Sequence, residues 1–120
     1  MRPGATRAAA VLLTATVAVG LSGCQDIPKS ASVKDFCSAG EKFSASTTFK
    51  QGVAAAKKLE STGTPKDIPA AARRGFVELV NRVLDAKDGQ DFLKKNKKLT
   101  SSQGKDLMAL TAYISKTCTL

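Results

Sequence analysis

Residues 68–87 read IPAAARRGFVELVNRVLDAK, and their apolar side chains recur at the spacing of an α-helix. They form one broad stripe with a period of 3.6 residues, made by Ala72, Phe76, Leu79, Val80, Val83 and Leu84. Charged side chains take the other faces: Arg73, Arg74, Glu78, Arg82 and Asp85. A helix with such a stripe buries it against neighbouring elements. The stretch therefore predicts an amphipathic helix over 68–87, with Asp67 as its N-cap and Pro69 in its first turn.

Three further segments show the same apolar spacing and begin after residues that cap helices well. They are 33–45, 48–61 and 101–117. Their N-caps are expected at Ser32, at Thr47 or Thr48, and at Thr100 or Ser101. Gly63 suits the position after the second helix, because glycine adopts the left-handed conformation that commonly ends a helix. Residues 90–98 (QDFLKKNKK) are predicted to form a short helix or a turn.

No segment alternates β-branched and polar residues as a half-buried strand does. The chain of 120 residues has room for one domain. We therefore expect an all-α fold, a small antiparallel bundle of about four helices. The first and last helices of an up-down-up-down bundle are neighbours.

The N-terminal residues are arranged as a secretory signal peptide. Arg2 and Arg7 precede a run of uncharged, mainly apolar residues over 8–20, and small residues lead to a cysteine. The sequence Leu21-Ser22-Gly23-Cys24 matches the lipobox of bacterial lipoproteins at all four positions. With its basic and apolar leader, the chain resembles the small secreted helical lipoproteins of high-GC Gram-positive bacteria.

This resemblance implies that residues 1–23 are a lipoprotein signal peptide, cleaved between Gly23 and Cys24. It also implies that Cys24 becomes the first residue and carries a covalent diacylglycerol and acyl (palmitate-type) lipid. Residues 24–32 would then be the lipidated N-terminus and a tether without structure, and 33–120 the helical domain. The protein is thus expected at the extracytoplasmic face of the cell membrane, held by its lipid anchor.

Acylation of Cys24 would leave two cysteines, Cys37 and Cys118. Disulfides persist outside the cytoplasm, so we predict that these two residues pair. The alternative is two free thiols buried in the core. The topology favours pairing, because antiparallel packing brings the start of the first helix to the end of the last. A metal site is not expected, since the chain has no histidine and two cysteines do not complete a tetrahedral zinc site.

The absence of histidine also removes the Ser-His and Cys-His arrangements of nucleophilic catalysis. The ten acidic residues are scattered, and the densest group, Asp85, Asp88 and Asp91, does not match a calcium loop. We interpret these three as helix-end and turn acids. The sequence therefore predicts a non-enzymatic protein, with no catalytic residue and no cofactor beyond the covalent lipid.

Basic residues outnumber acidic ones, and the net charge is +9, or +7 once Arg2 and Arg7 are removed with the signal peptide. The densest basic run is Lys94, Lys95, Lys97 and Lys98. It is interpreted either as a site for anionic lipid or acidic cell-wall polymer, or as a solvated helix end. Nucleic acid is not an expected partner, because the expected compartment holds little of it and the chain has one tyrosine and no tryptophan for stacking.

The five phenylalanines fall mostly on predicted inner faces: Phe36, Phe43, Phe49, Phe76 and Phe92. We expect them to form the core, and the alternative is that they line a pocket. These features lead to the hypothesis of a membrane-anchored module that binds an envelope component or partner protein. The alternative hypothesis is a carrier of a small apolar ligand or lipid.

Overall fold

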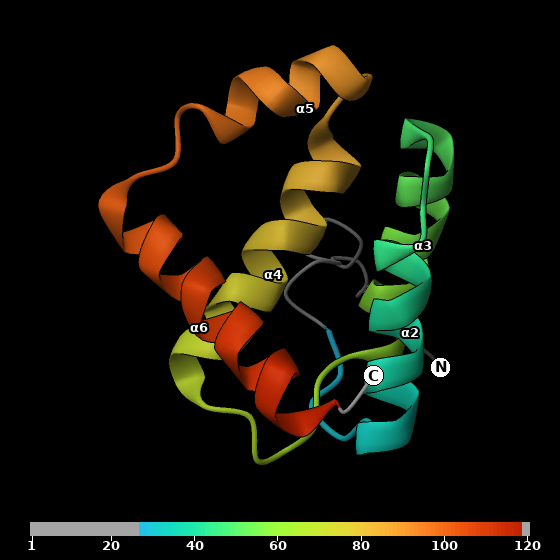
Figure 1. Cartoon of the computed structure of the whole chain (residues 1–120), viewed down its shortest axis with the longest axis vertical. Coiled ribbons are helices and arrows are strands. Elements are labelled where there is room, and N and C mark those ends of the chain that lie inside the picture. The colour runs from blue at the N-terminus through green and yellow to red at the C-terminus, as the bar shows by residue number, and fades with distance from the viewer. Residues whose placement is uncertain (1–26, 119–120) are drawn as a thin grey trace, which may run out of the picture.

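A computed structural model describes residues 27–118, and Figure 1 shows the helices of this part of the chain. They are α2 (Val33–Ser44), α3 (Phe49–Thr62), α4 (Ala70–Asp85), α5 (Gly89–Asn96) and α6 (Ser101–Thr117). No residue from 27 to 118 lies in a strand, so the all-α prediction is confirmed over this range. The long helices begin and end within two residues of their predicted bounds. The segment predicted as a short helix or a turn contributes α5.

Local hydrogen bonds explain where most of these helices begin. Four side chains accept a hydrogen bond from a backbone N–H of the first turn, those of Ser32, Thr48, Asp88 and Thr100. The predicted cap at Asp67 is wrong, because α4 begins after Pro69 and has no side-chain cap. A residue that precedes proline is disfavoured in helical geometry. Ile68 therefore cannot open the helix, and the first turn starts two residues later.

The helices form an open arrangement rather than a closed bundle. In Figure 1, α2 and α3 lie side by side in opposite directions, and α5 crosses the end of α4. The main partner of α6 is α4, while α2 and α6 touch in few places. The Cys37–Cys118 disulfide joins α2 to the end of α6, and the two helices diverge away from this bond (Figure 1). The first and last helices, α2 and α6, are therefore neighbours as predicted only at the end that carries the disulfide.

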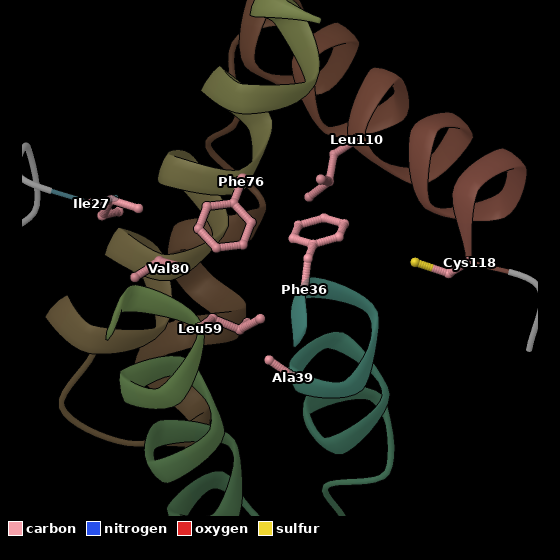
Figure 2. Packing of buried hydrophobic residues seen from close by; sticks show 8 residues of the cluster. All are labelled: Ile27, Phe36, Ala39, Leu59, Phe76, Val80, Leu110 and Cys118. Atoms are coloured by element: carbon pink, nitrogen blue, oxygen red, sulfur yellow. The ribbon is translucent and has the colours of Figure 1, made fainter. Parts of the chain in front are cut away.

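The buried core lies between α2, α3, α4 and α6. Figure 2 shows Phe36 and Phe76 facing each other at its centre, with ring centroids 5.8 Å apart. Tyr113 of α6 adds an edge-on contact to Phe36, also at 5.8 Å. Further apolar side chains close around this pair, including Ala39, Leu59, Val80 and Leu110. Burial of such side chains is the main favourable term in the stability of a domain of this size.

Helices α4 and α6 approach each other closely at Gly75. A methyl group added to Gly75 would overlap the backbone carbonyl group of Asp106 and press on the side chain of Leu110. The glycine is therefore required by the packing of the two helices. Gly40, Gly52 and Gly104 have no such neighbour, since a methyl group there would meet nothing within 4 Å.

The structure corrects the expected tether at residues 27–31, which pack on the domain. The side chain of Ile27 is 3% exposed and belongs to the core (Figure 2). The backbone of Thr64 donates a hydrogen bond to Pro28 and accepts one from Ala31. Gly63 adopts a φ of 81° and has no side chain, which leaves room for the Pro28 carbonyl. The expected tether without structure therefore does not include residues 27–31, and residues 24–26 lie outside the described residues.

Candidate functional site

The predicted cysteine pair is present in the structure. Cys37, in the second turn of α2, forms a disulfide with Cys118 at the end of α6, and their Cα atoms are 5.5 Å apart. Cys118 is 7% exposed and lies in the core cluster. The disulfide thus joins the two helices whose contact is otherwise slight. The predicted lipidation site Cys24 and the signal peptide 1–23 lie outside the described residues.

The four lysines of the predicted basic run do not act as one patch. Lys94, Lys97 and Lys98 are exposed at the end of α5 and in the turn after it. Lys95 instead points back to the domain, where its Nζ donates to the Asp85 carbonyl at 3.0 Å and pairs with the Asp91 carboxylate at 3.3 Å. The structure therefore presents three lysines to solvent and uses the fourth to hold α5 against the end of α4.

A polar network fixes the position of this lysine-bearing segment. Arg82 of α4 donates to the Lys95 carbonyl at 2.7 Å and to the Gln103 side chain at 3.1 Å, and it pairs with Glu78. Gln103 also completes the capping box of α6 with Thr100. The Arg82 side chain is 13% exposed, so its contacts are shielded from water. One arginine thereby links α4, the end of α5 and the start of α6.

The acids near this segment act as caps, as the sequence predicts. Asp88 accepts a hydrogen bond from the Asp91 backbone at 2.8 Å, and the Asp91 carboxylate accepts one from the Lys87 backbone at 2.8 Å. The hydrogen bond from Lys87, and after it the hydrogen bond and charge of Lys95, hold the pKa of Asp91 below its ordinary value. Both contacts favour the ionised carboxylate.

We expect the start of α5 to loosen on acidification. The lowered pKa of Asp91 means that its ionised form is favoured by folding. That stabilisation is complete above the ordinary aspartate pKa of about 3.9 and is lost as the pH falls through the lowered value in the folded protein. An NMR titration should place the Asp91 midpoint below this ordinary value, and Asp91→Asn should remove the pH dependence of the Lys87 amide shift. A midpoint at or above the ordinary value would contradict the capping role.

The phenylalanines divide into two groups that the sequence does not separate. Phe36 and Phe76 are buried in the core, as expected. Phe43, Phe49 and Phe92 are half-buried and line an apolar groove of about 520 Å³. Helix α5 forms one wall of this groove and carries Leu93, which is 59% exposed. The expectation that all five form core is therefore wrong for Phe49 and Phe92, while Phe43 lines the groove and also packs against the core cluster.

A second apolar hollow results from the divergence of α6 from α2. This cleft has a volume of about 230 Å³. Its lining comes mainly from α2, α4 and α6 and includes Phe36, Phe43, Leu79, Leu107 and Ile114. Gly40 also faces it, with no atom within 4 Å of the position that a side chain would occupy. The open packing of the helices thus leaves an apolar space next to the core.

Arg73 is a residue whose role the sequence does not reveal. Its guanidinium donates to the carbonyl groups of Ile27 at 2.7 Å and Pro28 at 3.1 Å, and to the Thr64 hydroxyl at 2.7 Å. Partial burial lowers the pKa of Arg73 from its ordinary value, and the group remains a cation near neutral pH. Arg73 therefore clamps the docked N-terminal segment to the first turn of α4.

Two kinds of feature are absent from the part of the chain that the structure describes. Between residues 27 and 118, no three His, Cys, Asp or Glu side chains are grouped so that they could hold a metal ion. In the same range, no helix is both long and apolar enough to cross a membrane. Comparison with known proteins found no matching family model, no similar curated protein and no similar solved structure.

Proposed function

We propose that this protein is a lipid-anchored, non-enzymatic binding module on the extracytoplasmic face of the cell membrane. The lipobox at residues 21–24 supports the anchor. The observation that carries the binding role is the end of the molecule formed by α5. There Lys94, Lys97 and Lys98 are exposed, and the same helix borders the apolar groove of Phe43, Phe49 and Phe92.

The chemistry of this end fits an acidic envelope component, such as a cell-wall polymer. The three exposed lysines form no ion pair with the described part of the chain, so their charges are available to a ligand. Lys95 and Arg82 hold the backbone that carries them. A basic surface on a fixed support loses less conformational freedom on binding than one on a free loop.

Binding to isolated Gram-positive cell walls tests this function. The triple variant K94Q/K97Q/K98Q is expected to bind at least about tenfold more weakly, since each lysine at an anionic surface contributes about 1 kcal/mol. The matched control is K34Q/K57Q/K116Q, which removes the same charge from exposed lysines that do not adjoin the groove beside α5. Its affinity for the cell walls should stay within about twofold of the wild type if the position of the lysines, rather than the net charge of the protein, determines binding. Equal losses in both variants would contradict a site at α5.

A second candidate function is the transport or storage of a small apolar ligand. It is favoured by the cleft of about 230 Å³ beside the core. This volume is below the range of about 300–1,000 Å³ of drug-sized ligand pockets, so a short acyl chain or similar molecule is the class that fits. A well-packed domain would fill such a space, because cavities reduce stability.

Native mass spectrometry of the protein purified from membranes tests this second function. We expect a non-covalent apolar adduct in the wild type and its loss in Gly40→Leu, whose side chain would occupy the cleft. Gly104→Leu is the control, because Gly104 is also unobstructed but lies outside the cleft. Absence of an adduct from the wild type, or equal loss in both variants, would rule out the cleft as a carrier site.

A further inference from the structure

The docked N-terminal segment fixes the place where the chain leaves the domain. Ile27 is buried in the core, and Arg73 holds the carbonyl groups of Ile27 and Pro28. Arg73 lies in the first turn of α4, and Thr64, which also bonds to Pro28, lies in the loop between α3 and α4. The chain therefore enters the domain at the N-terminal end of α4.

Few residues separate this point from the proposed lipid anchor. Cys24 precedes Ile27 by three residues. Three residues span at most about 11 Å even when fully extended. A lipid on Cys24 would therefore hold the N-terminal end of α4 close to the membrane, whatever conformation the connecting residues adopt. A free tether over the whole of the expected range 24–32 would have allowed more than twice this distance.

The surface at this end of α4 carries a cationic depression of about 380 Å³. Its basic lining residues are Lys29, Lys66, Arg73 and Arg74. No carboxylate lines it, although Asp67 is exposed beside Lys66 and Asp106 pairs with Arg74 at 3.1 Å. Arg73 is occupied by the N-terminal segment, while Lys29 and Lys66 are exposed. Pro65 and Ile68 also line the depression.

We infer that this depression is the membrane-facing surface of the protein and that Lys29 and Lys66 contact anionic lipid headgroups. The inference rests on the proposed acylation of Cys24, which brings the surface within reach of the bilayer. The cations of the depression complement the negative surface potential of anionic lipids, and that potential acts within about one Debye length, about 8 Å at physiological salt. Lys29 follows the buried Ile27 by two residues, so the docked segment holds its charge on the domain surface, next to the point where the chain enters from the anchor.

The same geometry directs the lysines of α5 away from the membrane. Lys95 is bonded to Asp85, the last residue of α4, whereas Arg73 lies in the first turn of that helix. Asp85 lies twelve positions after Arg73 in this helix, which corresponds to about 18 Å along the axis. Figure 1 shows α5 across the end of α4 that is opposite the loop between α3 and α4. Lys94, Lys97 and Lys98 would thus face outward, where an envelope component is found.

Lysine labelling on vesicles tests the orientation. The protein purified with its own anchor is inserted into vesicles of phosphatidylcholine, either alone or mixed with phosphatidylglycerol. A membrane-impermeant amine reagent is then added, and labelled lysines are located by mass spectrometry. Headgroup contact worth about 1 kcal/mol lowers the population of uncontacted lysine about fivefold. Labelling of Lys29 and Lys66 should therefore be about fivefold slower on the anionic vesicles than on phosphatidylcholine alone. Lys94, Lys97 and Lys98 should react as fast as in detergent.

Each outcome of this experiment decides one part of the inference. Protection of Lys94, Lys97 and Lys98 in place of Lys29 and Lys66 would overturn the orientation. Equal protection of Lys29 and Lys66 on both kinds of vesicle would overturn the contact with anionic headgroups. An intact mass without lipid would refute the proposed anchor, and that failure is visible before labelling. The unanchored protein would then be sedimented with anionic vesicles, where K29Q/K66Q must weaken binding more than K97Q/K98Q if the surface is correct.

Discussion

Loss of the Cys37–Cys118 disulfide is expected to destabilise the domain by about 4.5 kcal/mol. The two cysteines are 81 residues apart. In the chain-entropy model, closing a loop of that length lowers the entropy of the unfolded state and raises its free energy by about this amount. Small domains have a total stability of about 5–15 kcal/mol, so the loss is a large share of it. The folded state also depends on the bond, because α2 and α6 have little other contact.

Urea denaturation of C37A/C118A measures this effect. We expect a lower urea concentration at the midpoint of unfolding. The helical signal of the folded protein without urea should change little, since α6 keeps its packing on α4. Addition of a reductant should lower the midpoint of the wild type to a similar value and leave the double variant unchanged, which serves as the control. A double variant within about 1 kcal/mol of the wild type would show that the packing of α6 on α4 suffices.

The helices are predictable from the sequence because their determinants are local. Apolar spacing defines each buried face, and Ser32, Thr48 and Thr100 mark the first turns through hydrogen bonds to residues three positions away. The miss at Asp67 has a local cause as well, since Pro69 excludes helical geometry at Ile68. Information of this kind lies within a few neighbouring residues, where a single sequence is most informative.

The docking of residues 27–31 is not predictable in this way, because its partners are distant in the sequence. Ile27 is a single apolar residue between charged and proline residues. Its carbonyl group accepts a hydrogen bond from Arg73, and its side chain packs in the core cluster. One signal is visible afterwards: Gly63, expected only as a helix end, also leaves space for Pro28. The pattern of 27–31 alone is that of a linker.

The candidate sites show the same division between local and tertiary information. The basic run is evident in the sequence, but the bond from Lys95 to the Asp85 carbonyl group joins residues ten positions apart and depends on the packing of α5 on α4. The phenylalanines fall mostly on predicted inner faces, yet the position of α5 leaves three of them around a groove. Charge and periodicity thus identify the residues of a surface, and the helix arrangement decides which of them act together.

Gly75→Ala is expected to destabilise the domain by about 1–3 kcal/mol, the usual cost of overpacking a tightly packed interface. The added methyl group would overlap the Asp106 carbonyl group, which is backbone and cannot rotate away. Helices α4 and α6 must separate to accommodate it, and this also strains the ion pair between Arg74 and Asp106. The effect is opposite in sign to that of most glycine-to-alanine changes within helices, which stabilise them by about 0.5–1 kcal/mol.

Gly104→Ala is the matched control, because Gly104 lies in α6 near the same interface and an added methyl group there meets nothing within 4 Å. Its thermal midpoint should rise, while that of Gly75→Ala should fall by several degrees, since about 1 kcal/mol shifts the midpoint of a domain of this size by about 4–8 °C. Opposite shifts would show that contact between α4 and α6, rather than helix propensity, requires glycine at position 75. A rise of the thermal midpoint in both variants would mean that the two helices are not in close contact at Gly75. The packing of α4 on α6 described above would then be wrong.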